Sequence, residues 1–455
     1  MKIIIIGVGT IGETILKTLL EEDHTVTVVD EDEAVIGRLI ERYDIFGVVG
    51  NGACREVQEE AGVKDAELVI ALTNSDELNI WACMVAKNVG AQSTVARVRN
   101  PAYATQILDM KDELGISMII NPERETAREI FHVINLPAVL QIERFAKGRV
   151  LMVEIALDKE STLIGESLIS MSKKLTSRVL VCAVQRGENV VIPSGHFVLE
   201  QGDRIHVTSD AGSLADFLAE IGQLGTPLKN VMIVGGGKIG FYLAEYLCSR
   251  RRKKYQVKLI ESDRETAEEL AELLPRTTVI HGNGTHHDLL IEEGVEAMDA
   301  FVALSDNDEE NIIVSMFAEK MGVRKAITEV RSDDLYGMLD QLGIKNHVSP
   351  KNIVASRVIS YIRALANKRG SNVLTLYRLV GNRVEALEFA ARQQLSIYDV
   401  PLKELRIKED CLIACIIRGN EVIIPDGNSR IEKGDNVIAV TTHKNFDDLS
   451  DLFDA

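Results

Sequence analysis

The sequence predicts an α/β protein: two doubly wound parallel-sheet lobes, each followed by a smaller α+β lobe, in the order A-B-A-B. Three observations support this fold class. Short runs of β-branched residues alternate with amphipathic stretches, as in βαβ units. An apolar run ending in G-x-G-x-x-G occurs twice, from Gly7 and from Gly235. The segments that follow the two copies also match, which indicates a tandem duplication.

Within the first A lobe, strands are expected over 2–7, 25–30, 68–73 and 93–98, where the chain reads KIIIIG, TVTVVD, LVIALT and STVARV. Amphipathic segments separate these runs, and they predict the covering helices. The B lobes show hairpin signals instead: RGENV, PSG and EQGD in the first copy, and RGNE, PDGN and EKGD in the second. Such turn residues between short alternating strands indicate antiparallel or mixed sheets.

The duplication sets the expected domain limits. GNGACREVQEEAGV from Gly50 matches GNGTHHDLLIEEGV from Gly282, and VQRGENVVIPSG from Val184 matches IIRGNEVIIPDG from Ile416. The linker between the halves is GQLGTPLKN, around Pro227. We therefore expect A lobes over 1–135 and 228–362 and B lobes over 136–223 and 363–455.

Composition excludes several classes of protein. The net charge is -18, from 51 Lys and Arg against 69 Asp and Glu, whereas a nucleic-acid binder needs clustered cations for phosphate contacts. No apolar stretch approaches the roughly 18 residues that span a bilayer. Both facts indicate a cytoplasmic protein that does not bind nucleic acid.

Each glycine loop follows a strand and opens a helix, which is the context of a Rossmann dinucleotide-binding loop. The first glycine makes the tight turn, the second lets the backbone approach phosphate, and the third lets helix pack on strand. The helix N-terminus then offers free N–H groups to a pyrophosphate. The candidate loop residues are Gly7, Val8, Gly9, Thr10, Ile11 and Gly12, and Gly235, Gly236, Gly237, Lys238, Ile239 and Gly240.

An acid ends the next strand of each copy, Asp30 in the first and Glu261 in the second. A carboxylate here accepts hydrogen bonds from ribose hydroxyls and disfavours a 2′-phosphate, so NAD+ or NADH is favoured over NADP. The acid does not separate NAD from ATP or ADP, which also carry a free ribose.

Two further pairs in each copy follow expected strands. Asn51-Gly52 and Asn283-Gly284 lie at the rim where adenine would bind, although Asn-Gly also favours a plain turn. Thr73-Asn74 and Ser305-Asp306 follow the fourth strand, where they would contact nucleotide, cap the next helix, or do both.

The two copies differ in charge at the fifth strand. Arg97 and Arg99 are candidate phosphate ligands in the first copy, but Glu329 takes the place of Arg97 in the second. Lys238 replaces Thr10 and would compensate in part. We therefore expect two sites that are not equivalent, with the second binding anions more weakly or differently.

Two other clusters are assigned no chemistry. The histidine-rich segment 281–288 resembles a metal site, but the first copy has no ligands there, so no metal is predicted. The basic run in 249–255 closes a helix, where cations complement its dipole, or contacts another subunit or a membrane protein. No His or Lys recurs at the sheet rim of both copies, and no catalytic residue is predicted.

The order A-B-A-B, with GVGTIG, VVD, GNGA and ALTNSDELN and then IPSG and EQGD, resembles the TrkA proteins of bacterial potassium-uptake systems. Each A lobe is similar to an RCK_N (KTN) domain and each B lobe to an RCK_C domain. The resemblance covers essentially the whole chain.

The resemblance implies a regulatory subunit that gates a TrkH-type membrane potassium channel, on the inner face of the cell membrane. It implies four tandem chains in an eight-lobe ring, NAD+ or NADH in the RCK_N lobes, and also ATP or ADP. Two sites suit a nucleotide that is a signal and not a reactant. The alternatives are an NAD-dependent oxidoreductase with duplicated Rossmann domains and a scaffold whose sites no longer bind.

Overall fold

The computed structural model describes residues 1–454 of the 455-residue chain, apart from 137–138, 158, 160, 224–227, 250–254, 337, 340, 345, 368–371, 381–382, 393–394, 445 and 447. The linker expected around Pro227 and most of the basic run after Ser249 lie outside the described residues. In the part of the chain that is described, no helix is long and apolar enough to cross a membrane.

The chain forms two compact units, and neither is continuous in sequence. One holds Met1–Phe131 and Lys229–Ile359, and the other holds His132–Leu228 and Ser360–Ala455. The two A lobes therefore share one unit and the two B lobes share the other, although the chain runs through them alternately.

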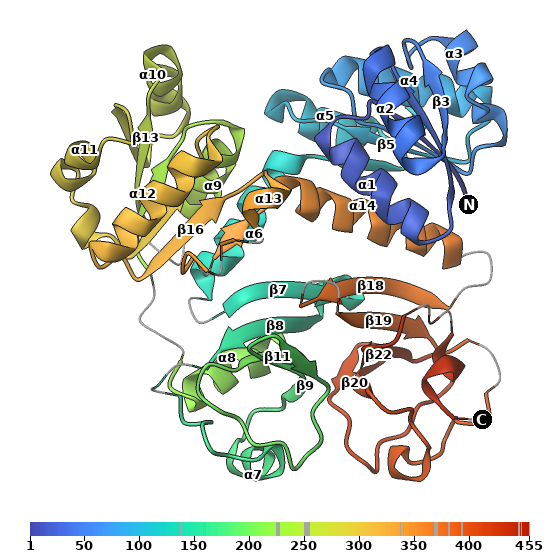
Figure 1. Ribbon diagram of the computed structural model, residues 1–455, viewed down its shortest axis with the longest axis vertical. Helices are drawn as coiled ribbons and strands as arrows, with labels where there is room; N and C mark the ends of the chain where they lie inside the picture. The colour runs from blue at the N-terminus through green and yellow to red at the C-terminus, as the bar shows by residue number, and fades with distance from the viewer. Residues whose placement is uncertain are drawn as a thin grey trace. The chain divides into compact units, whose positions relative to one another are not determined.

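The first A lobe, drawn in blue in Figure 1, has a six-stranded parallel sheet in the order β3-β2-β1-β4-β5-β6. Its elements are β1 (Lys2–Ile6), α1 (Thr10–Glu21), β2 (Thr25–Asp30), α2 (Glu33–Tyr43), β3 (Phe46–Val49), α3 (Arg55–Glu60), η1 (Val63–Asp65), β4 (Leu68–Ala71), α4 (Asp76–Val89), β5 (Ser93–Arg97), α5 (Pro101–Met110), β6 (Met118–Ile120) and α6 (Pro122–Asn135). This order is the doubly wound arrangement that the sequence predicts.

The second A lobe repeats the topology, in the order β14-β13-β12-β15-β16-β17. Its elements are β12 (Asn230–Val234), α9 (Lys238–Ser249), β13 (Gln256–Glu261), α10 (Arg264–Leu273), β14 (Thr277–His281), α11 (His287–Glu292), η3 (Val295–Ala297), β15 (Ala300–Ala303), α12 (Asp308–Lys320), β16 (Lys325–Glu329), α13 (Asp333–Tyr336), β17 (His347–Val348) and α14 (Pro350–Asn367).

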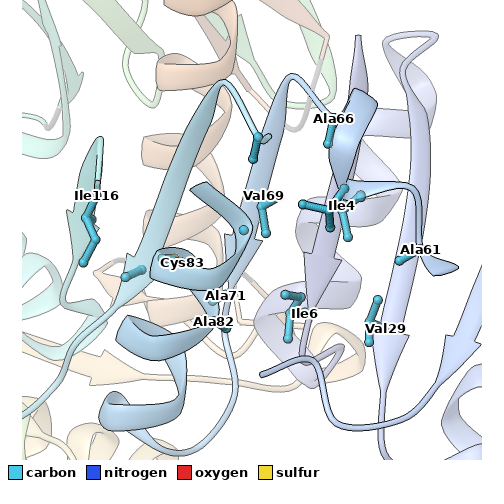
Figure 2. Close-up of a cluster of buried hydrophobic side chains, with 14 of the residues drawn as sticks. Ile4, Ile6, Val29, Ala61, Ala66, Val69, Ala71, Ala82, Cys83 and Ile116 are labelled. Atoms are coloured by element: carbon cyan, nitrogen blue, oxygen red, sulfur yellow. The ribbon is translucent and has the colours of Figure 1, made fainter. Parts of the chain in front are cut away.

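Burial on both faces explains why the central strands read as continuous apolar runs. In β1 all four isoleucines are buried. Ile4 and Ile6 point to the face covered by α4 and pack in one cluster with Ala82 and Cys83 (Figure 2). Because successive side chains of a strand alternate, Ile3 and Ile5 fill the opposite face.

This topology positions the site. The strand order reverses between β1 and β4, whose pairing runs from Ile3 opposite Leu68 to Ile6 opposite Ala71. The segment after β1 leads towards β2 on one side, and the segment after β4 leads towards β5 on the other side. A crevice therefore opens between these two segments at the carboxyl edge of the sheet. Every first-copy candidate residue predicted from the sequence lies at or just beyond this edge.

Each B lobe contains a five-stranded antiparallel sheet, in the orders β10-β9-β11-β8-β7 and β18-β19-β22-β20-β21. The elements are β7 (Val139–Phe145), η2 (Ala146–Gly148), β8 (Val150–Ala156), α7 (Leu168–Lys174), β9 (Leu180–Arg186), β10 (Asn189–Val191), β11 (Arg204–Asp210), α8 (Ala211–Glu220), β18 (Val373–Leu379), β19 (Val384–Ala390), η4 (Leu402–Glu404), β20 (Cys411–Arg418), β21 (Glu421–Ile423), β22 (Asn436–Thr441) and η5 (Leu449–Leu452). One apolar cluster draws on both sheets, with Phe145 and Cys182 from the first and Ala386 and Cys415 from the second.

The residues that recur most clearly in the B lobes are structural. The Arg186 guanidinium binds both carboxylate oxygens of the buried Asp203, each at 2.8 Å. Arg418 does the same to Asp435, at 3.0 and 2.9 Å. A buried carboxylate with a bidentate partner is well compensated, so these pairs explain the repeated RG and GD motifs without a ligand.

Acid should destabilise the B-lobe unit through His206, which is 2% exposed on β11. Burial, with Arg204 as a second cause, lowers the pKa of His206 from 6.5 to about 4. Its contribution to stability is therefore complete above pH 6.5 and is lost as the pH falls towards 4, by about 3 kcal/mol at most.

Chemical denaturation at pH 7.5, 5.5 and 4.5 should show this loss. The variant His206→Ile, which copies Ile438 at the matching position of β22, should lack this component. Equal pH dependence in both proteins would contradict the assignment.

Candidate functional site

One crevice of about 830 Å³ lies at the carboxyl edge of the first parallel sheet. Twelve first-copy candidates line it: Gly7, Val8, Gly9, Thr10, Ile11, Gly12, Asp30, Asn51, Gly52, Thr73, Asn74 and Arg97. Arg99, also a candidate phosphate ligand, lines a second, smaller pocket instead. The twelve residues of the crevice come from five separate loops. Parallel strands bring them together because their carboxyl ends meet at one edge.

The three glycines of the first loop differ in how much space their surroundings leave for a side chain. Gly7 has φ +85°, and a Cβ there would lie 2.7 Å from the backbone nitrogen of Thr73. A Cβ on Gly12 would lie 2.7 Å from the Gly7 carbonyl oxygen, whereas one on Gly9 would meet nothing within 4 Å. Gly7 and Gly12 are thus required by packing, and Gly9 leaves open space in the crevice.

The helix after this loop begins with free donors. Gly9 is the N-cap of α1, and no side chain caps the helix. The first intrahelical bond is donated by the Glu13 N–H to the Gly9 carbonyl, at 2.9 Å. The N–H groups of the first turn therefore remain available, and together with the helix dipole they favour an anion.

Asp30 has a structural role that the sequence did not reveal. Its Oδ2 accepts a hydrogen bond from the Val8 N–H at 2.8 Å, and its Oδ1 accepts one from the Asp32 N–H at 3.1 Å. In the second copy the Gly236 N–H donates to Oε2 of Glu261 at 2.7 Å. The acid holds the glycine loop in place in both copies, and each oxygen of Asp30 can accept a further hydrogen bond.

Capping of α4 corrects one sequence interpretation. Thr73-Asn74 was expected to cap this helix, to bind ligand, or both, but the N-cap is Ser75, whose side chain accepts from the Leu78 N–H at 3.2 Å. In the second copy the cap of α12 is Asn307 and not Ser305 or Asp306. Because Ser75 is the N-cap, Asn74 lies in the loop before α4 and does not cap the helix.

Arg97 is the main buried cation of the crevice. It is 8% exposed, and its guanidinium donates to Oδ1 of Asn74 at 3.1 Å, while its Nε has no hydrogen-bond partner among the described residues. Burial, followed by the neighbouring charge of Arg99, lowers its pKa from the ordinary value. A buried cation with an unused donor, at the edge of the phosphate-binding loop, is suited to an anionic ligand.

The second copy is arranged differently. A smaller pocket of about 430 Å³ is lined by Gly237, Lys238, Ile239, Gly240 and Asp306 from the second copy and by residues of the first, including Thr10 and Arg97. The other second-copy candidates, Gly235, Gly236, Glu261, Asn283, Gly284 and Ser305, follow the corresponding strands but do not line this pocket.

This smaller pocket is lined by residues of both copies, and at two matching positions the two copies carry opposite charges. Arg97 is replaced by Glu329, as the sequence showed, but Glu123 is replaced by Lys351, and both lie beside the pocket. Sequence reasoning missed Glu123 and Lys351. At these two positions the second copy therefore keeps one cation and one carboxylate, but each stands on the element that carries the opposite charge in the first copy.

Two glutamates of the pocket, the buried Glu329 and the half-buried Glu123, are partly uncompensated. Glu329 is 1% exposed, and Arg331 donates to its Oε1 at 2.8 Å, but its Oε2 has no hydrogen-bond partner. Burial raises the pKa of Glu329, and Arg331 opposes the shift. Burial likewise raises the pKa of Glu123, whose Oε2 also has no partner, against the nearby charges of Arg99 and Lys238.

The histidine-rich segment offers only a weak ion pair. His287 Nε2 lies 3.3 Å from Asp288 Oδ1, and both side chains are largely exposed. In the described residues no group of three or more His, Cys, Asp or Glu side chains is arranged to hold a metal ion.

Two family models match the chain, each of them twice. The TrkA-N domain matches residues 3–122 and 231–350, and the TrkA-C domain matches residues 152–222 and 396–454. These ranges contain both glycine loops and part of each antiparallel sheet, with β9, β10 and β11 in the first TrkA-C match and β20, β21 and β22 in the second. The chain belongs to the TrkA family.

Relatives and solved structures agree with this family. The TrkA homolog 1 of Methanosarcina mazei is 31% identical, over 96% of each chain, and is described as a Trk system potassium uptake protein. The TrkA protein of Halomonas elongata is 33% identical, over 98% of this chain and 96% of its own. Among solved structures, the GsuK channel bound to NAD has the same fold, with a TM-score of 0.63 at 16% identity, covering 97% of this chain and 76% of that one.

The glycine geometry predicts separate effects on stability and on binding. Gly12→Ala should cost roughly 1–3 kcal/mol of unfolding free energy, because its Cβ would press on the Gly7 carbonyl. Gly9→Ala should change stability by less than about 1 kcal/mol, because its Cβ meets open space, while the crevice becomes narrower. Thermal unfolding of both variants checks this, and equal destabilisation would contradict it.

Glu329 should lower stability at neutral pH. Because its folded pKa is raised, its favourable contribution is present below about pH 4.5, the ordinary value, and is lost as the pH rises through the folded value. Glu329→Gln keeps an acceptor for Arg331 and removes the charge. We expect a higher Tm than wild type at pH 7.5 and no difference near pH 4. A lower Tm for the variant at pH 7.5 would show that its charge is stabilising.

Proposed function

We propose that this protein is a nucleotide-sensing regulatory subunit that gates a membrane potassium-uptake channel. The observation that carries the proposal is the first crevice, in which free helix N–H groups, Asp30 and the buried Arg97 surround one space. These are groups that bind a nucleotide phosphate and ribose. Membership of the TrkA family supports the link to potassium uptake.

The proposed ligands are NAD+ or NADH, and also ATP or ADP. Asp30 sits where a ribose hydroxyl would donate a hydrogen bond, and its charge would repel a 2′-phosphate. GsuK, which shares the fold, has been solved bound to NAD and bound to ADP, which supports both classes of ligand. The residues predicted for this role are the twelve that line the first crevice, with the second-copy set as a weaker or different site.

The mechanism requires binding and no bond-breaking step. A ligand that binds one arrangement of the two A lobes more tightly than another shifts the population toward it. A coupling of about 1–3 kcal/mol per site corresponds to roughly a 5- to 150-fold bias. Several sites in one assembly would add their effects and make the response sharper.

The proposed partner is a TrkH-type channel subunit at the inner face of the cell membrane. We propose four chains in a ring of eight A lobes, with the B lobes as further assembly or sensing surfaces. This assignment makes the protein a binding subunit and not an enzyme. The closely matching relatives over the full chain length support it, since they are described as parts of a Trk potassium-uptake system.

Calorimetric titration with NADH, NAD+, ATP and ADP tests the proposal. Asp30→Ala should weaken binding to the first crevice at least 10-fold, because it removes the ribose acceptor and frees the glycine loop. Asp30→Asn is the matched control, since it keeps an acceptor without the charge. Glu261→Ala, which alters the second glycine loop, should change binding to the first crevice by less than Asp30→Ala does.

Turnover of NADH with a small substrate would instead indicate an oxidoreductase. Absence of binding to either half would indicate a scaffold. Binding without turnover, weakened by Asp30→Ala, would lead to reconstitution with the channel subunit.

A further inference from the structure

A buried tyrosine of the second half contacts the segment that follows β5 in the first half. Tyr242 lies on α9, the helix that opens at the second glycine loop, and is 3% exposed. Its hydroxyl accepts a hydrogen bond from Nδ2 of Asn121 at 3.1 Å and donates to the Arg99 carbonyl at 3.4 Å. Asn121 Nδ2 also donates to that carbonyl, at 3.2 Å. The phenol therefore closes a three-membered polar cluster inside the A-lobe unit.

This cluster holds the backbone that carries the crevice cations. The Arg99 N–H donates to Oδ2 of Asp76 at 2.9 Å, and its guanidinium donates to the Asn74 carbonyl. The Arg97 guanidinium donates a hydrogen bond to the Asn74 side chain. Because Asn74 and Arg97 both line the first crevice, fixing the Arg99 carbonyl also fixes the edge of the proposed phosphate site.

The same tyrosine is rigidly joined to the second glycine loop. The first turn of α9 closes with the Phe241 N–H donating to the Gly237 carbonyl at 2.9 Å, and Tyr242 is the next residue. A Cβ on Gly240 would lie 2.1 Å from the Gly235 carbonyl oxygen, so helix and loop are in tight contact. A displacement of the loop must therefore move the phenol.

Among the described residues, the hydrogen bonds of Tyr242 have no counterpart at the matching positions of the duplication. Thr14 and Ser349 occupy the positions that match Tyr242 and Asn121 in the duplication. Thr14 donates to its own helix, at the Thr10 carbonyl, and the buried Ser349 hydroxyl has no hydrogen-bond partner. Within the described residues, α1, the helix after the first glycine loop, thus makes no equivalent hydrogen bond to the second half.

We propose that Tyr242 is a positioning residue for the first crevice and couples it to the second glycine loop. Its hydroxyl stays protonated, since burial raises its pKa, and so it remains a donor to the Arg99 carbonyl. The ligand-affinity part of this inference rests on the proposed function, whereas the positioning part does not.

Tyr242→Phe removes only the hydroxyl and tests the inference. Tyr246→Phe is the matched control, because Tyr246 lies one turn further along α9 and accepts from Arg124 Nε at 3.0 Å without touching Arg99. Hydrogen exchange of the segment 96–100 should become faster in Tyr242→Phe and stay as in wild type in Tyr246→Phe. The affinity of the first crevice for NADH should fall roughly 3- to 10-fold in Tyr242→Phe alone.

Coupling is tested by a double-mutant comparison. Glu261→Ala frees the second glycine loop, and it should change first-crevice affinity in the wild-type background but not in Tyr242→Phe. Asn121→Ser, which copies Ser349, removes the hydrogen bond from the Asn121 side chain to the Tyr242 hydroxyl. This variant replaces Tyr242→Phe in the experiment if Tyr242→Phe does not fold.

Three outcomes separate the explanations. If wild type binds no nucleotide, the proposed function fails, and hydrogen exchange still decides whether Tyr242 positions Arg99. If exchange and affinity in Tyr242→Phe equal those of wild type, the inference is overturned. Equal changes in Tyr242→Phe and Tyr246→Phe would also overturn it, because they would reflect loss of contact between the A lobes in general.

Discussion

The contact between each glycine loop and the neighbouring strand end is the constraint on which the site depends. Gly7 lies so close to Thr73, and Gly12 so close to Gly7, that no side chain fits at either position. The same contacts bring the end of β1 against the end of β4 and leave the first turn of α1 open. Asp30 then holds the loop through its backbone. The crevice is thus a consequence of packing at the sheet edge.

Duplication of this arrangement has not produced two equal sites. The first crevice is lined entirely by its own half, whereas the pocket beside the second glycine loop draws residues from both. The exchange of Arg97 for Glu329 is accompanied by the exchange of Glu123 for Lys351. Charge is therefore redistributed at the boundary between the A lobes and not simply lost. At this smaller pocket, each half supplies groups next to the glycine loop of the other half.

The B lobes follow a different principle. Their repeated motifs encode bidentate ion pairs, Arg186 with Asp203 and Arg418 with Asp435, that hold the chain between β9 and β11 and between β20 and β22. A single apolar cluster spans both sheets. Motif repetition in the B lobes thus follows from folding requirements, while repetition in the A lobes also preserves the glycine loop at the sheet edge.

The sequence by itself determined the fold class, the duplication and the residues of the first crevice, because these depend on local signals: strand periodicity, glycine spacing and an acid at a strand end. Tertiary structure alone decided which lobes pair, since the A-B-A-B order does not show that A lobes share a unit. It also decided that Ser75 caps α4, that Lys351 enters the second pocket, and that Tyr242 reaches Arg99. Each of these depends on side chains far apart in sequence or on a one-residue difference in loop geometry, which no periodicity reports.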